Sequence, residues 1–155
     1  MRLLPILIGA LTMSTAAHAE QKAEWKLVIH GGAGSIQRAR TGPDKDRDLR
    51  AALDGALAAG SQILAAGGSA LDAVEASVKL LEDDPNFNAG RGAVFTFDGK
   101  NELDASIMDG RTRAAGAVTG VTMTRHPVSL ARAVMEHGKH VFLSHAGADQ
   151  FSKEQ

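Results

Sequence analysis

Cysteine is absent from this chain of 155 residues. Its absence excludes a disulfide scaffold, a thiolate zinc site and a cysteine nucleophile. The chain also carries no large charge of one sign, because its 17 Lys and Arg residues are balanced by 18 Asp and Glu residues. The net charge of −1 therefore gives no electrostatic reason to expect nucleic acid or anionic lipid as a partner. Glycine, in contrast, is abundant at 17 residues, many in short clusters where backbone geometry carries information.

A membrane-spanning helix needs an apolar run of about 20 residues, and the sequence contains no run of that length. The apolar run from Leu3 to Leu11 follows one basic residue, Arg2, and precedes Ala17-His18-Ala19. This order is typical of a secretory signal peptide, whereas an amphipathic N-terminal helix would need a polar face. We therefore expect a signal peptide over residues 1–19, a mature domain over 20–155, and export, most simply to a bacterial periplasm, without a membrane anchor.

The spacing of apolar residues predicts a single α+β domain. Its elements are expected in the order strand, helix, helix, three strands, helix, strand, helix. They are a strand over 25–30, helices from about 44 to 66 and 70 to 84, a hairpin over 93–97 and 101–108, a strand over 114–122, a helix from 127 to 137, a strand over 140–143 and a helix from 146. Because Asp98-Gly99 and Asp109-Gly110 are turn signals, we expect an antiparallel sheet, covered by a layer containing the two early helices.

The second helix has a clear start. Ser69 with Asp72 three residues later approximates a capping box. The predicted buried stripe of this helix consists of Ala70, Val74, Val78 and Leu81.

A glycine-rich segment, His30-Gly31-Gly32-Ala33-Gly34, directly follows the first predicted strand. Consecutive glycines let the backbone approach a ligand closely and direct N–H groups at an oxyanion. The α/β-hydrolases use a similar loop, but they also need a G-x-S-x-G string that this chain does not contain. An oxyanion loop and a tight exit from a strand both explain the segment.

Three carboxylates, Glu82-Asp83-Asp84, stand at the end of the second predicted helix and oppose its macrodipole. Such a run is often a solvated helix end. It can also mark a cation that is held by the free carbonyl groups of the helix and the loop beyond it, up to Gly92. Both interpretations stay open on composition alone.

The remaining acidic residues and histidines give little support for a catalytic pair or a metal site. Asp104 and Asp109 are five residues apart, so a regular strand directs them to opposite faces. Glu102 shares a face with Asp104, and the two are equally well explained as the solvated side of a strand. His137 and His140 lack a third ligand at a recognised spacing.

Several long segments together resemble the plant-type L-asparaginases and isoaspartyl peptidases, a family of N-terminal-nucleophile hydrolases. They are residues 27–34, 70–74, 80–96, 102–110 and 115–118, and the resemblance covers nearly all of residues 25–151. It implies an αββα sandwich, of which this chain would hold an incomplete part.

The resemblance also implies where the chemistry lies. In this family a precursor cuts itself into α and β subunits, and a threonine at the start of β becomes the nucleophile. The cut normally falls in a Gly-Thr-Val-Gly string, but this chain contains no Gly-Thr dipeptide. We therefore expect no catalytic residue and no catalytic cofactor here. Asn88 and the residues His30, Gly31 and Gly32 would support the nucleophile.

A sodium-binding loop is a further implication of the resemblance. The ion would be held by the main-chain carbonyl groups of Leu81, Glu82, Asp84, Phe87, Ala89 and Arg91. Arg91 stands where many relatives carry an apolar residue. The sodium ion would be structural and would belong to the complete enzyme.

The expected function is that of a fragment of such a hydrolase. The complete enzyme would cleave the side-chain amide of L-asparagine or the β-linked bond of isoaspartyl dipeptides. Its partners would be a β subunit from the same precursor and a second αβ unit in a dimer. The alternative is a catalytically inert chain, either truncated or a pseudoenzyme.

Overall fold

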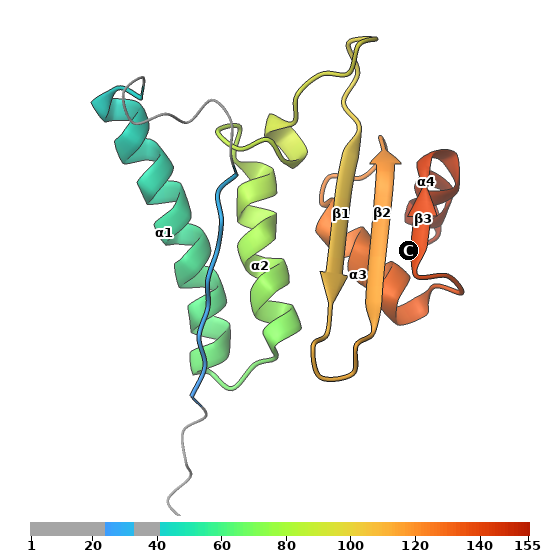
Figure 1. The fold of residues 1–155 in the computed structure, drawn as a ribbon, viewed down its shortest axis with the longest axis horizontal. Coiled ribbons are helices and arrows are strands. Elements are labelled where there is room, and N and C mark those ends of the chain that lie inside the picture. Colours follow the sequence, from blue (N-terminus) through green and yellow to red (C-terminus); the bar gives the residue numbers. More distant parts are fainter. Residues whose placement is uncertain (1–23, 33–40) are drawn as a thin grey trace, which may run out of the picture.

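The computed structural model describes residues 24–32 and 41–155. The predicted signal peptide, together with Ala33 and Gly34, lies outside the described residues. The described elements are α1 (Pro43–Ala65), α2 (Ala70–Asp83), a 3-10 turn η1 (Gly90–Gly92), β1 (Leu103–Met108), β2 (Ala115–Val121), α3 (Pro127–His137), β3 (Phe142–Ser144) and α4 (His145–Glu154). The predicted α+β class is confirmed (Figure 1). None of these helices is long and apolar enough to cross a membrane.

The two early helices form as the sequence predicts. Pro43 occupies the first turn of α1, where its missing N–H costs nothing. The Ser69 hydroxyl accepts the Asp72 backbone N–H at 3.1 Å and so caps α2. Small residues allow the helices to approach: a Cβ on Gly60 would lie 2.5 Å from Ser77 Oγ, and that hydroxyl donates to the Ala56 carbonyl at 2.8 Å.

The predicted buried stripe of α2 is wrong at Ala70 and Val74, while Val78 and Leu81 are half-buried. Val74 is 40% exposed and Ala70 is exposed, whereas Ala73, Ser77 and Glu82 are the buried residues of the helix. The reason is that α2 packs against α1 through its small residues rather than laying one apolar stripe on the sheet. Its Leu71 and Val78 reach the core from the side.

The sheet has three strands in the order β1, β2, β3. β1 and β2 are antiparallel, but β2 and β3 are parallel, so the predicted all-antiparallel sheet is wrong at its last strand. The cause is α3, which connects β2 to β3 as a crossover.

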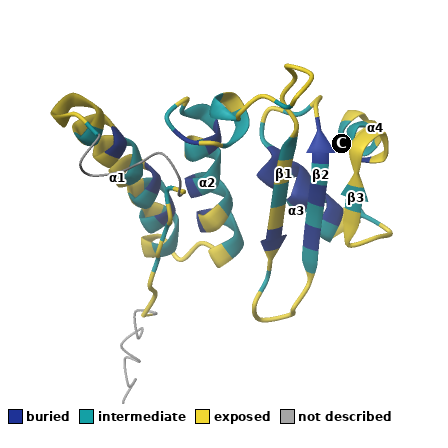
Figure 2. Ribbon diagram, turned by 45° about the horizontal axis from the view of Figure 1, so that its top comes forward, coloured by how far each residue is buried: buried dark blue, intermediate teal, exposed yellow. Residues whose placement is uncertain are grey.

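Helix α3, rather than the two early helices, covers the sheet. It lies behind β1 and β2 in Figure 1, and the buried residues gather on α3 and β2 in Figure 2. The main core comprises Ile107, Val118, Val121, Val128, Leu130, Ala131, Val134 and Ala148. The expected layer is therefore wrong for α1, which packs on α2 instead.

Two predicted strands lack partners among the described residues. Residues 25–30 are extended but pair with no strand, and the segment runs along α1 and α2 (Figure 1). Leu27 contacts α1 near Gly60. Residues 93–97 also form no strand, although the predicted turn at Asp98-Gly99 is present and is closed by the hydrogen bond from Thr96 N to Lys100 O at 2.7 Å.

Candidate functional site

The glycine-rich segment and the predicted sodium loop meet in space. A Cβ on Gly31 would lie 3.1 Å from a side-chain carbon of Leu53 in α1 and 3.1 Å from one of Phe87 in the loop. Phe87 is only 4% exposed. Next to this contact, Gly32 has φ +100° and donates its N–H to His30 Nδ1 at 3.1 Å. Gly31 is thus needed for close packing and Gly32 for its backbone conformation.

The loop after α2 folds back tightly on the helix end. Gly90 has φ +47°, and a Cβ there would lie 2.4 Å from the carbonyl oxygen of Glu82. A Cβ on Gly92 would lie 2.1 Å from the carbonyl oxygen of Phe87. The carbonyl oxygens of two of the six predicted sodium-binding residues, Glu82 and Phe87, therefore lie close against the backbone of the loop.

The other predicted carbonyl groups belong to the same turn. Those of Asp84 and Ala89 accept one backbone hydrogen bond each, from Phe87 and Gly92, and the Phe87 carbonyl accepts one from Ala89. A carbonyl oxygen has two lone pairs, so each retains one for a cation. Carbonyl oxygens with a free lone pair are the ligands that a hard cation prefers. Leu81 lies in the last turn of α2, which ends at Asp83, and Arg91 lies in η1 with an exposed side chain.

Asn88 projects from this loop toward a cavity of about 270 Å³. Its Oδ1 accepts the Val94 N–H at 2.9 Å, which leaves the amide NH2 group as a donor. The cavity is lined by Glu82, Asn88, Ala89, Gly90, Ala93, Val94, Glu102, Leu103, Asp104 and Pro127.

Glu82 is the buried carboxyl group of the site and is only 2% exposed. Its Oε1 accepts the backbone N–H of Val128 at 2.9 Å, while Oε2 has no hydrogen-bond partner among the described residues. Burial raises the pKa of Glu82 to about 7, although the Val128 hydrogen bond acts in the opposite direction. The sequence analysis did not predict this burial, because Glu82 stands first in a run of three carboxylates.

The other two carboxylates of the run, Asp83 and Asp84, bind different partners. Asp83 binds Arg125 at 2.9 Å and His126 at 3.0 Å, and mainly the Arg125 hydrogen bond lowers its pKa. Asp84 Oδ1 accepts the Asn86 N–H at 2.8 Å. The run is thus neither a purely solvated helix end nor a carboxylate cage, and no cluster of three His, Asp or Glu side chains suited to a metal ion occurs in the described part of the chain.

Asp104 is fixed by its neighbours on β2. Its Oδ1 accepts the Thr119 hydroxyl at 2.5 Å and the Gly120 N–H at 2.9 Å, and these hydrogen bonds lower its pKa. Asp109 is the turn residue that the sequence predicts, since it accepts hydrogen bonds from Arg111 N and Thr112 Oγ1 at 2.9 Å each. The two carboxylates do not form a pair.

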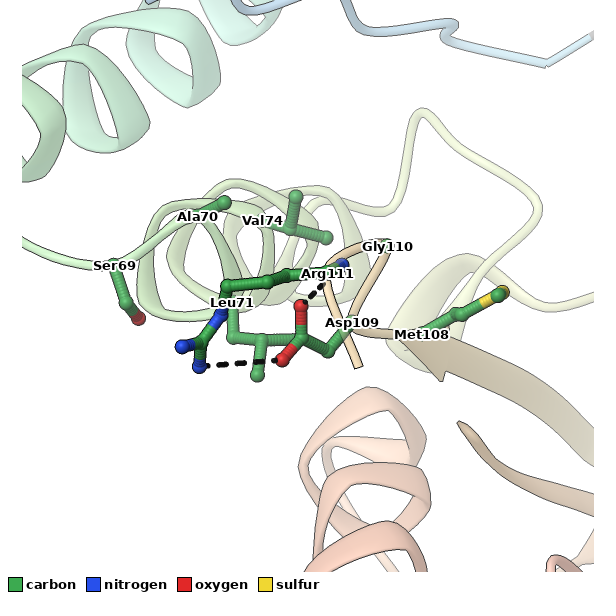
Figure 3. A pocket seen from close by; sticks show the side chains of 8 residues that line it. All are labelled: Ser69, Ala70, Leu71, Val74, Met108, Asp109, Gly110 and Arg111. Carbon is green, nitrogen blue, oxygen red and sulfur yellow. Dashed lines mark hydrogen bonds and ion pairs between the residues drawn. The ribbon is translucent and has the colours of Figure 1, made fainter. Parts of the chain in front are cut away.

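A second, more apolar cavity of about 500 Å³ lies between the start of α2 and the β1–β2 turn. In Figure 3, Arg111 extends across Leu71, and its guanidinium faces Asp109 at 3.8 Å. None of the predicted supporting or sodium-binding residues lines this cavity.

Comparison with known proteins places this geometry in a family. The model of the asparaginase family matches residues 23–155. A putative isoaspartyl peptidase/L-asparaginase of Dictyostelium discoideum is 49% identical over 129 residues, which are 83% of this chain and 37% of that protein. The isoaspartyl peptidase of Salmonella typhimurium is 50% identical over 129 residues, 83% of this chain and 41% of the relative. A plant-type L-asparaginase of Pyrococcus abyssi is 46% identical over 127 residues, 82% of this chain and 40% of the relative.

The α+β chain with its glycine-rich loop at a helix end is therefore a member of a hydrolase class. It belongs to the asparaginase family that also contains the isoaspartyl peptidases. The expected resemblance is confirmed. The chain spans about two fifths of the length of the curated relatives that it matches.

Proposed function

We propose that the chain is the N-terminal part of a hydrolase that cleaves the side-chain amide of L-asparagine or the β-linked peptide bond of isoaspartyl dipeptides. The observation that carries this proposal is the match to the isoaspartyl peptidase of Salmonella typhimurium, at 50% identity over 129 residues. The attacking group would be a threonine hydroxyl in the part of the protein that these residues do not include. Its own α-amine would act as the base, and water would then hydrolyse the acyl-enzyme.

The described residues would supply support for that threonine. Gly31 packs on Phe87, and Asn88 follows Phe87 directly, with an amide NH2 group that donates to no other described residue. Together they bring the predicted supporting residues to one end of α2. His30 would hold the Gly32 backbone in place through the 3.1 Å hydrogen bond.

A sodium ion would stabilise the same loop. The carbonyl groups of Leu81, Glu82, Asp84, Phe87, Ala89 and Arg91 would hold it, and it would contribute no catalytic step. The close approach of Gly90 to the Glu82 carbonyl supports this assignment, because it turns the helix end toward the loop.

The partner would be a β subunit from the same precursor, completing an αββα sandwich, and two such αβ units would form a dimer. One face of the described sheet supports this proposal. Asp104, Ser106 and Met108 on β1 are exposed on the face opposite α3, and Ser106 and Met108 lie opposite the small residues Ala117 and Ala115 of β2. A second sheet can approach such a face closely. Export to a periplasm stays part of the proposal.

The test of this proposal is the reading frame beyond codon 155. An in-frame continuation that encodes a Gly-Thr-Val-Gly string, and a product that cuts itself before the threonine, would support the hydrolase. A continuation without such a threonine would favour the alternative, a catalytically inert chain.

A further inference from the structure

Three Asp-Gly pairs occur in the chain, at Asp54-Gly55, Asp98-Gly99 and Asp109-Gly110. Glycine has no side chain to shield its amide nitrogen, so the aspartate carboxyl group before it can be attacked by that nitrogen when the backbone allows it. In an unfolded chain all three pairs are open to this reaction. In the folded protein, the three pairs differ in how far hydrogen bonds restrain the aspartate side chain and the backbone.

Two of the pairs are held in place. Asp54-Gly55 lies in the interior of α1, where the regular helix fixes the backbone and engages the glycine N–H. Asp109 has both carboxylate oxygens occupied, Oδ1 by the Arg111 N–H and Oδ2 by the Thr112 hydroxyl, at 2.9 Å each. Hydrogen bonds to a charged carboxylate are among the stronger ones in proteins.

Asp98 has no such restraint. Its side chain is exposed and has no hydrogen bond or ion pair with any residue in the described ranges 24–32 and 41–155. Gly99 has φ +72°, and a Cβ built on it would meet nothing within 4 Å. The Gly99 N–H itself makes one exposed hydrogen bond, to the Thr96 carbonyl at 3.0 Å, and this bond must open before the nitrogen can react. Two further exposed hydrogen bonds, between Thr96 and Lys100, close the turn around it but engage neither Asp98 nor the Gly99 nitrogen.

We infer that the Asp98-Gly99 turn is a site of spontaneous aspartate isomerisation. The Gly99 nitrogen attacks Asp98 Cγ, the new N–Cγ bond closes a five-membered succinimide, and one side-chain oxygen leaves as water with the amide proton and the carboxyl proton. Water then adds to one of the two ring carbonyl carbons. Addition at the Asp98 main-chain carbonyl carbon breaks its bond to nitrogen and leaves a β-linked peptide with a free α-carboxylate. The sequence of steps loses and regains one water and needs no other reactant.

The product changes the turn. The β-linkage adds one methylene group to the main chain between Thr96 and Lys100, whose backbone groups close the turn at 2.7 Å in the described structure. It also places a carboxylate on the backbone beside Gly99. This inference is independent of the proposed hydrolase activity, because no catalytic residue takes part.

The test is peptide mapping of the intact protein after prolonged incubation at 37 °C, with folding checked by circular dichroism on the same sample. Cleavage after Lys and Arg places the three pairs in separate peptides, residues 51–79, 92–100 and 101–111. Incubation in heavy-oxygen water labels each ring that opens. We expect the 92–100 peptide to gain the β-linked isomer at least about tenfold faster than the other two, because the restraints on those pairs must break first.

Two comparisons make the result decisive. In concentrated denaturant the three rates should converge, since the sequence Asp-Gly is common to all of them. Asp98→Glu should abolish the product in peptide 92–100, because the longer side chain closes a less favourable ring, while the matched variant Asp109→Glu should leave that rate unchanged. Equal rates at the three pairs in the folded protein, or faster reaction at Asp54 or Asp109, would overturn the inference.

Discussion

The side chain of Glu82 at the end of α2 accepts the backbone N–H of Val128 in the first turn of α3, at 2.9 Å and across 46 residues of sequence. This buried hydrogen bond joins the candidate sodium loop to the helix that covers the sheet. Glu82→Ala would leave the Val128 N–H without an acceptor in the interior, at a cost of about 1–3 kcal/mol in the free energy of unfolding. Glu82→Gln keeps an acceptor and should cost less. Urea unfolding of both variants measures the difference, and equal losses would contradict this role of the hydrogen bond.

The stability of the protein should fall as the pH rises through the pKa of Glu82. Burial raises this pKa from 4.5 to about 7, so the folded state holds the proton more tightly than the unfolded state does. The stabilisation is complete below the unfolded value and is lost as the pH rises toward and through about 7. The loss is of the order of 3 kcal/mol at most.

Urea midpoints at about pH 5.5 and about pH 8, in a sodium-free buffer, measure this loss. The Glu82→Gln variant is the control, because its amide does not titrate and its midpoint should change less between the two values. The same pH dependence in both proteins would show that Glu82 does not carry it.

In the candidate sodium loop, substitutions that disturb the backbone should lower stability more than substitutions that remove a charge. Gly90→Val should disrupt the loop, because its φ of +47° disfavours a β-branched residue and its Cβ would lie 2.4 Å from the Glu82 carbonyl oxygen. Asp84→Asn should change stability little, since an amide oxygen can still accept the Asn86 N–H. Thermal melts of the two variants give the comparison.

Sodium itself should raise the melting temperature of the unaltered protein, by the increment RT ln(1 + [L]/Kd) in the free energy of unfolding. Choline chloride at equal ionic strength controls for screening of the carboxylates. Equal melting temperatures in sodium and choline would show that the loop binds no sodium ion specifically and is a structural turn only.

The contact between β2 and α3 depends on Gly116. A Cβ at this position would lie 2.1 Å from the Ala131 carbonyl oxygen and 2.5 Å from the Met135 nitrogen, both in the backbone of α3. Gly116→Ala should therefore cost about 1–3 kcal/mol through overpacking. Gly110→Ala is the matched control, because a Cβ there meets nothing within 4 Å and the cost should stay within about 0.5 kcal/mol. Similar losses for both variants would contradict the close packing.

Local signals predicted much of this fold, and pairing across long distances accounts for the errors. The Ser69 cap, Pro127 at the start of α3 and the turn at Asp109 each depend on neighbouring residues, and each is found where the sequence places it. The segment 25–30 alternates in burial as a strand would, with Leu27 and Ile29 half-buried, but no described strand pairs with it. A strand needs a partner that its own residues do not specify.

In the candidate site, too, features that depend on neighbouring residues were predicted and a long-range contact was missed. The glycine-rich segment and the loop near Asn88 were predicted from their own residues and from the family resemblance. The burial of Glu82 was missed, because a run of three carboxylates usually faces solvent and the Val128 N–H that binds it lies far away in sequence. The four-residue step from Val78 to Glu82, on a helix that touches the core at Val78, is the local signal that pointed to it.

The most direct test of the account measures ammonia release from L-asparagine, and aspartate release from a β-aspartyl dipeptide, by two proteins. One is the 155-residue chain alone, and the other is the product extended in frame past codon 155. We expect the extended protein to be active and to lose activity when the threonine at its cleavage site is replaced by alanine, while the 155-residue chain stays at the level of a mock-purified control. Ammonia release by the 155-residue chain well above that control would contradict the account, because it would require a nucleophile within residues that we assign only to support.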